Sequence, residues 1–220
     1  MALDLALPRA ADTVAAWARQ QTTDLAVLVN NAGYGLWGRF EQLPLAEQQN
    51  MLQLNMALPV ALTHALLPAL RQGRAGVHPE RGQHRRAYQA VPSLTLYAAS
   101  KAFLLSFSRG LRYELKDSGI SVSCLCPGAT VTSFADRAGM GAELQKTANK
   151  VSMTADAVAA AAVAGLLAGQ AEIVPGLLNK VSSGLTSVVP KGLTGAHRGG
   201  DLREVFIGAA PHPRSLSPAS

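Results

Sequence analysis

Short apolar runs that end in small and polar residues constrain the fold of this chain most. Leu25–Val29 passes directly into Asn30–Gly33, and Ile120–Cys126 passes into Pro127-Gly128. Near-continuous apolar runs of this length are typical of parallel strands that are buried on both faces. In open α/β sheets, ligands bind at the carboxyl ends of such strands. The two runs therefore predict a parallel sheet with a ligand crevice where they end.

Helical segments alternate with these runs. The expected elements are the end of a strand at Leu3–Leu5, a helix at Pro8–Gln20, a strand at Asp24–Val29, helices at Leu45–Leu67 and Ser93–Lys116, a strand at Ile120–Cys126, a helix from Thr154 or Asp156 to Ala168, and a strand at Glu172–Val174. This alternation predicts an α/β fold with a doubly wound parallel sheet. We expect one domain over residues 1–195 and a loose polar tail over residues 196–220. Pro59 is expected to kink the long helix, and Ser133–Lys150 is expected to be a mobile segment beside the substrate.

The positive charge is concentrated in one segment. The net charge is +6, and residues 71–86 hold five arginines and one glutamate, which leaves +2 for the rest of the chain. No zinc-ligand spacing, aromatic stacking set or recognition helix accompanies this segment, so we expect no nucleic-acid partner. Cys124 and Cys126 lie two residues apart in a predicted strand and share a face, where we expect buried thiols and no metal site.

The sequence predicts no membrane segment. No run reaches the ~20 uninterrupted apolar residues that a helix needs to span a bilayer. The start of the chain, Met1–Leu5, lacks the basic region of a secretory signal. We therefore expect a cytoplasmic chain with no membrane partner.

Tyr97 and Lys101 are the candidate catalytic pair. They lie four residues apart in a predicted helix and therefore share one face. A lysine ammonium beside a tyrosine hydroxyl favours the phenolate, and such a tyrosine can exchange a proton with an alcohol or carbonyl oxygen. Two exposed helical residues also show this spacing by chance, so the argument depends on the neighbouring motifs.

The loop after the first apolar run matches a dinucleotide-binding glycine pattern. Residues 33–38 read Gly-Tyr-Gly-Leu-Trp-Gly. A phosphate-binding loop of this kind enters a helix at once, and the first turn of that helix holds the pyrophosphate. Here bulky side chains fill the loop and Pro44 delays the helix. We therefore do not interpret this loop as a phosphate cradle.

Three motifs occur in a characteristic order. They are Asn30–Gly33 after a strand, Tyr97-Ala98-Ala99-Ser100-Lys101 on a helix, and Pro127–Thr132 after a second strand. Together they resemble the short-chain dehydrogenase/reductase family, and the similarity extends from about Met1 to Pro190. The resemblance implies a Rossmann-like fold, an NAD or NADP cofactor, and hydride transfer between nicotinamide and a carbonyl or alcohol substrate.

The resemblance also implies roles for individual residues. Tyr97 is the expected acid/base, Lys101 supports it and binds the nicotinamide ribose, and Asn55 holds a water for proton relay. Considered in isolation, Asn55 is equally well a solvated helix residue. The cofactor residues expected from the matching motifs are Asp4, Leu5, Asn30, Asn31, Ala32, Gly33, Tyr97, Lys101, Pro127, Gly128 and Thr130.

The family also suggests partners for this chain. The loop at residues 33–38 borders the substrate in the family, so Leu36 and Trp37, with Phe134 and Met140, are consistent with an apolar substrate. The helices expected at Leu45–Leu67 and Ser93–Lys116 pair subunits in the family, so we expect a homo-oligomer.

One part of the family pattern is absent from the start of the chain. The glycine-rich phosphate loop of the family belongs to its first strand and helix. This chain begins at what resembles the third strand, so we expect the first two strands and helices, on the order of 60 residues, to be missing. The pyrophosphate cradle and the residue that chooses between NAD and NADP would be missing with them.

A second departure lies thirteen residues before Tyr97, where the family has a serine and this chain has His84. Residues 78–86 contain a proline and three arginines, which a central strand buried on both faces does not tolerate. Codons compatible with these residues, read one base later, encode Ile-Leu-Asn-Val-Ala-Ser-Ile-Ala-Ala, a good buried strand that contains the serine. We infer a compensated frameshift, and the alternative is a basic loop that binds an anion.

Three hypotheses follow from the sequence. The first is an NAD(P)-dependent oxidoreductase of the short-chain type. The second is a truncated or misread remnant without a working cofactor site, which the two departures favour. The third is a protein that binds its partner through the basic residues 71–86.

Overall fold

The computed structural model describes residues 2–72, 77–80, 93–128, 130–131, 134–140 and 152–176. The chain divides into two compact units, Met1–Val188 and Val189–Ser220, and every described residue lies in the first unit. The tail expected over residues 196–220 lies outside the described residues, as do most of the basic residues 71–86 and of the segment Ser133–Lys150.

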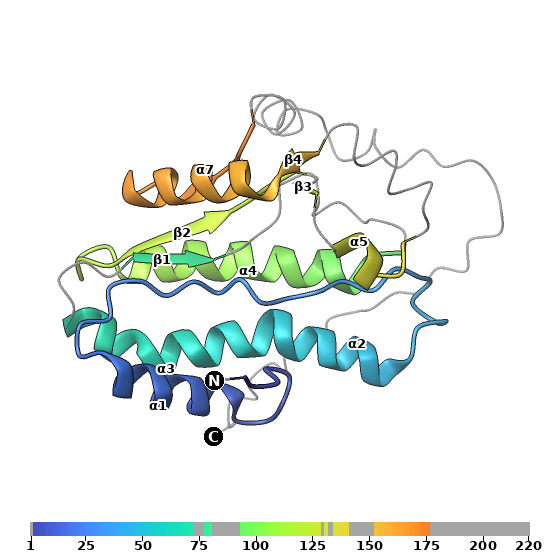
Figure 1. The fold of residues 1–220 in the computed structure, drawn as a ribbon, viewed down its shortest axis with the longest axis horizontal. Coiled ribbons are helices and arrows are strands. Elements are labelled where there is room, and N and C mark those ends of the chain that lie inside the picture. The colour runs from blue at the N-terminus through green and yellow to red at the C-terminus, as the bar shows by residue number, and fades with distance from the viewer. Residues whose placement is uncertain are drawn as a thin grey trace, which may run out of the picture. The chain divides into compact units, whose positions relative to one another are not determined.

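Helices and parallel strands alternate along the described part of the chain (Figure 1). The helices are α1 (Ala10–Gln21), α2 (Leu45–Leu52), the π-helical segment η1 (Gln53–Ala57), α3 (Leu58–Gln72), α4 (Thr95–Glu114), α5 (Phe134–Arg137) and α7 (Ala155–Leu167). The strands are β1 (Val77–Glu80), β2 (Ser121–Leu125), β3 (Thr130–Val131), β4 (Met153–Thr154) and β5 (Glu172–Ile173). The four predicted long helices are confirmed. Thr154 and Asp156 were the two candidate N-caps of α7. Thr154 is the one observed, because its Oγ1 accepts the Ala157 N–H at 3.3 Å.

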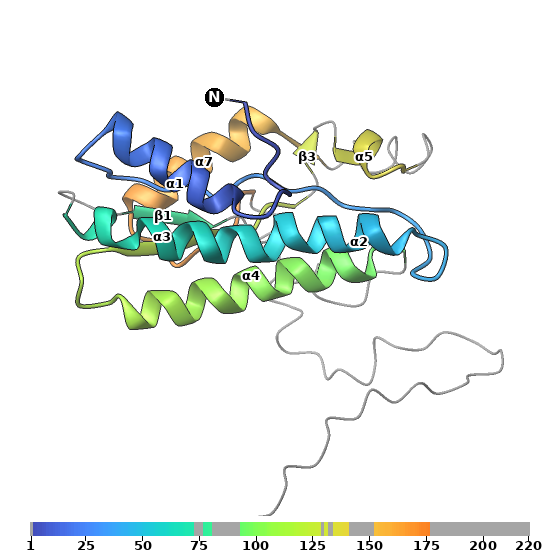
Figure 2. The same ribbon diagram turned by 90° about the horizontal axis from the view of Figure 1, so that it is seen from below.

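The parallel sheet is confirmed as well. β1, β2 and β5 lie in that order, with Val77 opposite Ser121 and Cys124 opposite Glu172. Helix α4 packs on one face of this sheet and α7 on the other (Figure 2), which is the doubly wound arrangement. β3 and β4 form a second, two-stranded parallel ladder that the sequence did not predict.

A π-helical turn joins α2 and α3 into one continuous helix. Pro59 has no N–H, and its ring would clash in an α-helix with the carbonyl of Asn55, four residues earlier. The wider turn accommodates this, since the Leu58 N–H donates to the Gln53 carbonyl five residues back. The predicted effect of Pro59 therefore takes the form of a π-helical turn rather than a break in the helix.

Two strand predictions are wrong. Residues 3–5 are a loop and the start of a turn, and the run Asp24–Val29 contains one isolated bridge residue, Val27, with a second directly after the run at Asn30. Leu28 is 8% exposed, whereas Val27 and Val29, which share the opposite face, are 42% and 59% exposed. A regular buried strand needs neighbours on both faces, and the described residues cover one face only.

Residues 77–80, which include Pro79, form a strand, at an outer place in the described order rather than the central one that a proline was expected to exclude. β1 contains His78, Pro79 and Glu80, and it pairs in parallel with β2. β1 is the outermost of the three strands in the described order, and an outer strand tolerates a proline because one side of its ladder need not be hydrogen-bonded. Pro79 is compatible with this outer strand, whereas residues 81–86, which hold the three arginines, lie outside the described residues, so the frameshift stays a prediction. His84 lies outside the described residues.

The main core lies between α1, α3 and β2. Ala15, Leu66, Leu70 and Val122 are each at most 2% exposed in this cluster. Burial of each such aliphatic side chain contributes about 1.5–3 kcal/mol. This core fixes the helix that carries Asn55 against the sheet.

Cys124 and Cys126 are buried with Leu105 in a second cluster beside α4. Their sulfurs lie 4.0 Å apart on the same face of β2, and neither is in a disulfide. The predicted buried thiols are thus confirmed. The described residues hold no group of three side chains that would bind a metal ion.

The continuous helix Leu45–Gln72 is long and apolar enough to cross a bilayer by length and composition alone. The core helix of a soluble protein passes the same test, and this helix carries Leu62, Leu66 and Leu70 into the main core. It is therefore weak evidence for a membrane span.

Candidate active site

Tyr97 and Lys101 lie on the inner face of α4. Each is 6% exposed, so the alternative of two exposed helical residues is wrong. The Lys101 Nζ lies 5.4 Å from the centre of the Tyr97 ring. Their spacing along the sequence therefore places a cation beside the phenol in a largely dehydrated environment, where charge interactions are stronger than in water.

Asn55 is fully buried and connects α4 with the loop after the first apolar run. Its Nδ2 donates to the Tyr34 carbonyl at 2.9 Å and to Ser100 Oγ at 3.1 Å, and its Oδ1 accepts the Tyr34 N–H at 3.2 Å. Ser100 Oγ in turn donates to the Tyr97 carbonyl at 2.7 Å. The alternative of a solvated helix residue is therefore wrong for Asn55.

Gly33 lies between the candidate catalytic groups. A Cβ atom built on Gly33 would lie 2.8 Å from Asn55 Oδ1 and 3.3 Å from Lys101 Nζ. A side chain at this position would displace one of the two groups. The end of the first apolar run, the long helix and α4 thus converge at one point.

The remaining cofactor residues lie at several places. Asn31, Ala32 and Gly33 are exposed, whereas Asn30 turns towards α3 and donates to Thr63 Oγ1 at 3.0 Å. At the end of β2, Pro127 is buried, Gly128 is half-buried, and Thr130 Oγ1 donates to the Gly128 carbonyl at 3.1 Å.

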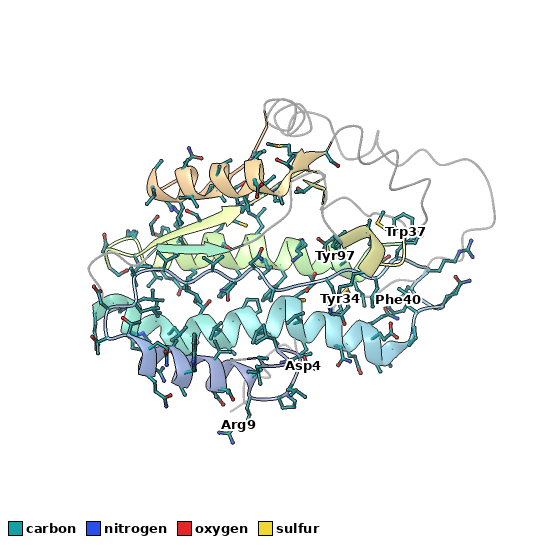
Figure 3. The ribbon with its side chains drawn as sticks, in the orientation of Figure 1. Asp4, Arg9, Tyr34, Trp37, Phe40 and Tyr97 are labelled. Atoms are coloured by element: carbon teal, nitrogen blue, oxygen red, sulfur yellow. The ribbon has the colours of Figure 1, made fainter. Side chains whose placement is uncertain are left out.

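The structure does not bring Asp4 and Leu5 to Tyr97. Asp4 accepts the Ala6 N–H at 3.0 Å within the amino-terminal turn, and Figure 3 shows it apart from Tyr97. Leu5 packs against the main core. Both residues lie at the start of the chain, apart from Tyr97, and their expected contact with the adenine end of the cofactor stays a prediction.

A small pocket adjoins Tyr97. Its volume is about 10 Å³, which is room for a single water. The pocket is lined by Leu36, Gly38, Phe40, Leu43, Gln48, Met51, Thr95, Leu96 and Tyr97. Of the residues expected to form an apolar wall, Leu36 lines this pocket.

Tyr34 and Arg137 are neighbours that the sequence did not indicate. The Arg137 guanidinium lies 5.0 Å from the centre of the Tyr34 ring, and the Tyr34 hydroxyl donates to the Glu47 carbonyl at 3.3 Å. Burial raises the pKa of the Tyr34 phenol above its ordinary value, and the charge of Arg137 opposes that shift. Because residues 34 and 137 are far apart in the sequence, no local pattern could have revealed this contact.

A family model described as short chain dehydrogenase matches residues 1–142, a stretch that includes Asn55, Tyr97 and Lys101. The chain belongs to the short-chain dehydrogenase family. Among curated relatives of this chain, ketoacyl reductase HetN of Nostoc sp. is 29% identical over 180 residues, which cover 77% of the chain and 59% of the relative. Retinol dehydrogenase 8 of Bos taurus is 38% identical over 114 residues, which cover 52% of the chain and 36% of the relative. The chain thus spans less than two thirds of the length of either relative.

Solved structures confirm the Rossmann-like fold. A short-chain dehydrogenase from Sphingobium yanoikuyae in complex with NADPH matches this chain with a TM-score of 0.70 and 27% identity, over 89% of this chain and 76% of that one. A short-chain dehydrogenase from Streptomyces avermitilis matches with a TM-score of 0.67 and 26% identity, over 86% of this chain and 74% of that one.

Proposed function

We propose that this chain carries the site of an NAD(P)-dependent oxidoreductase that transfers hydride between nicotinamide and a carbonyl or alcohol. The observation that supports this most is the convergence of Tyr97, Lys101, Asn55 and Gly33. Membership of the short-chain dehydrogenase family supports the same chemistry. The substrate we propose is a small carbonyl or alcohol compound with an apolar body, because Leu36 and Phe134 lie beside Tyr97.

Tyr97 is the proposed acid/base. In the reductive direction its hydroxyl gives a proton to the substrate oxygen, and in the oxidative direction it takes that proton back. The Lys101 ammonium stabilises the phenolate that Tyr97 becomes after it has given up the proton. Asn55 holds the Tyr34 backbone in position, and the second acceptor site of its Oδ1 is where we propose that a relay water binds.

The residues beside Tyr97 fit the nicotinamide ribose of a cofactor. Gly33 has no side chain, and this leaves space next to Lys101 Nζ. A Cβ atom on residue 33 would fill that space. Lys101, Gly33, Pro127 and Gly128 would hold this end of the cofactor. When bound, the nicotinamide supplies or accepts the hydride. Solved relatives in complex with NADPH support a nicotinamide cofactor here.

Cofactor titration tests this proposal. NADH and NADPH are each added to the purified chain, and nicotinamide fluorescence is followed. We expect saturable binding at micromolar concentration for one of them. Lys101→Met is expected to weaken that binding by about ten- to a hundredfold, because a hydrogen bond from a charged group is worth 1.5–3 kcal/mol. Lys116 is exposed and lies two residues after the end of α4. Lys116→Met is therefore the matched control and should leave cofactor binding unchanged.

A second candidate is a non-catalytic remnant without a working cofactor site. The observation that favours it is that the run Asp24–Val29 forms no regular strand and leaves Val27 and Val29 exposed, because the strands of a doubly wound parallel sheet are normally covered on both faces. The same titration separates the two candidates. Fluorescence that does not saturate with either nucleotide, in a chain shown to be folded by circular dichroism, would leave only the remnant.

We also propose that the outer faces of α3 and α4 pair two copies of the chain. A groove of about 590 Å³ lies along η1 and α3, with Phe103 as its contribution from α4, and it is lined by Asp12, Met56, Ala57, Val60, Ala61, His64, Ala65 and Phe103. Gly110, further along α4, has open space where a side chain would lie. Phe103→Glu is expected to convert a dimer into a monomer, since the substitution places a charge in an apolar contact. Light scattering after gel filtration measures this, with Ser106→Glu as a control for charge on the same helix. A monomeric parent chain would contradict the pairing.

A further inference from the structure

The ring of Phe134 covers Tyr97. The two ring centres lie 5.1 Å apart, with an angle of 44° between the ring planes. Phe134 is the first residue of α5, which follows β3, whereas Tyr97 lies near the start of α4. With Tyr97 only 6% exposed, a compound that approaches its side chain from this direction meets Phe134 first.

Gly35 has no side chain, and the ring of Phe134 occupies the space where one would lie. A Cβ atom built on Gly35 would lie 2.7 Å from Phe134 Cζ and 3.2 Å from Tyr97 Cδ2. The backbone of Gly35 is not in the left-handed region that favours glycine. Close approach of the two rings, rather than backbone conformation, therefore explains why a glycine stands here.

Two further contacts fasten α5 to the same loop. The Trp37 N–H donates to the Ala138 carbonyl at 2.8 Å, and the Arg137 guanidinium lies over the Tyr34 ring. In Figure 3, Tyr34, Trp37 and Tyr97 gather around α5. The position of Phe134 is thus supported by its neighbours on both sides, not by the ring contact alone.

We propose that Phe134 controls access to Tyr97 and so determines which carbonyl compounds reach it. A small or flat compound reaches the phenol beside the ring, whereas a bulky one requires Phe134 to move. The inference deepens the proposed function, because it takes Tyr97 as the acid/base. Control of access to this tyrosine can nevertheless be measured without turnover.

Nitration of tyrosine by tetranitromethane provides that measurement. The extent of nitration at Tyr97 and at Tyr113, which is 73% exposed, is followed by mass spectrometry of the peptides. Phe134→Ala is expected to raise the rate at Tyr97 by about tenfold, the size expected when one packed aromatic pair is lost. Tyr113 should not change. Phe103→Ala, which removes a phenylalanine from the outer face of α4, is the matched control and should leave Tyr97 protected.

A double-mutant cycle tests the part played by Gly35. Gly35→Ala should lower the urea midpoint of the parent chain, because the new methyl group collides with Phe134. In the Phe134→Ala background, Gly35→Ala should lower the urea midpoint by less, because the ring with which the new methyl group collides has been removed. An equal decrease of the urea midpoint in the two backgrounds would show that Gly35 does not accommodate Phe134.

Kinetics separates this inference from the proposed function. In an active chain, Phe134→Ala should raise kcat/KM for benzophenone relative to benzaldehyde by about tenfold, the discrimination typical of one apolar contact. An unchanged ratio, or unchanged nitration of Tyr97, would overturn control by Phe134. Loss of protection at Tyr97 without turnover in any variant would instead refute the proposed function and leave control of access standing.

Discussion

Tyr97→Phe is expected to lower turnover of a carbonyl substrate by about 10²–10⁴-fold, the usual contribution of a positioned acid/base. The change removes only the hydroxyl. The ring can keep its contact with Phe134 and its place on α4. Cofactor affinity should therefore stay as it is in the parent chain. Loss of NADPH absorbance in the presence of an aldehyde gives the rate, and the fluorescence titration gives the affinity.

The matched control for this change is Tyr113→Phe on the same helix. Tyr113 is 73% exposed and should be replaceable without effect on the rate. If Tyr97→Phe retains the parent rate, the proton comes from another group, and the role proposed for Tyr97 is wrong. A pH–rate profile of the parent chain identifies the essential ionisation in either case.

Asn55→Ala is expected to destabilise the fold by about 2–4 kcal/mol. Three hydrogen bonds of a fully buried amide are lost, and the Tyr34 N–H, the Tyr34 carbonyl and Ser100 Oγ lose a partner. Urea unfolding followed by circular dichroism measures this loss. The loop at Tyr34 should also become more accessible to protease, because Asn55 fastens it to the long helix.

Asn50→Ala provides the comparison, since Asn50 is an exposed residue of the same helix. Its effect should stay within about 0.5 kcal/mol, as for most surface substitutions. If both variants unfold at the same urea concentration, the hydrogen bonds of Asn55 do not hold the site together.

The elements around the site were predictable where a local pattern exists. The helical pair Tyr97 and Lys101 shares a face because the helix repeats every ~3.6 residues, and this follows from spacing alone. The parallel strand β2 followed from its apolar run. The same reasoning failed at Asp24–Val29, because a strand also needs neighbours that the run itself does not specify.

The position of Asn55 could be expected only from the family. Its burial depends on the turn that Pro59 imposes, and a regular period does not predict a π-helical turn. Phe134 was expected near the substrate, but its contact with Gly35 was out of reach for another reason. Their contact joins residues that are distant in the sequence, and close packing of this kind is decided by the assembled fold.

The uncovered valines have a consequence for the chain in solution. Residues 25–29 contain no lysine, proline or other residue that guards exposed apolar strands against association. Val27 and Val29 present their side chains to water on one face. Exposed hydrophobic surface of this kind favours association with other molecules, and this face is one of several on the described residues where large apolar side chains are exposed, Leu45 and Leu167 among them. A charged residue in place of Val29 would act on colloidal behaviour while leaving Tyr97 and Lys101 untouched.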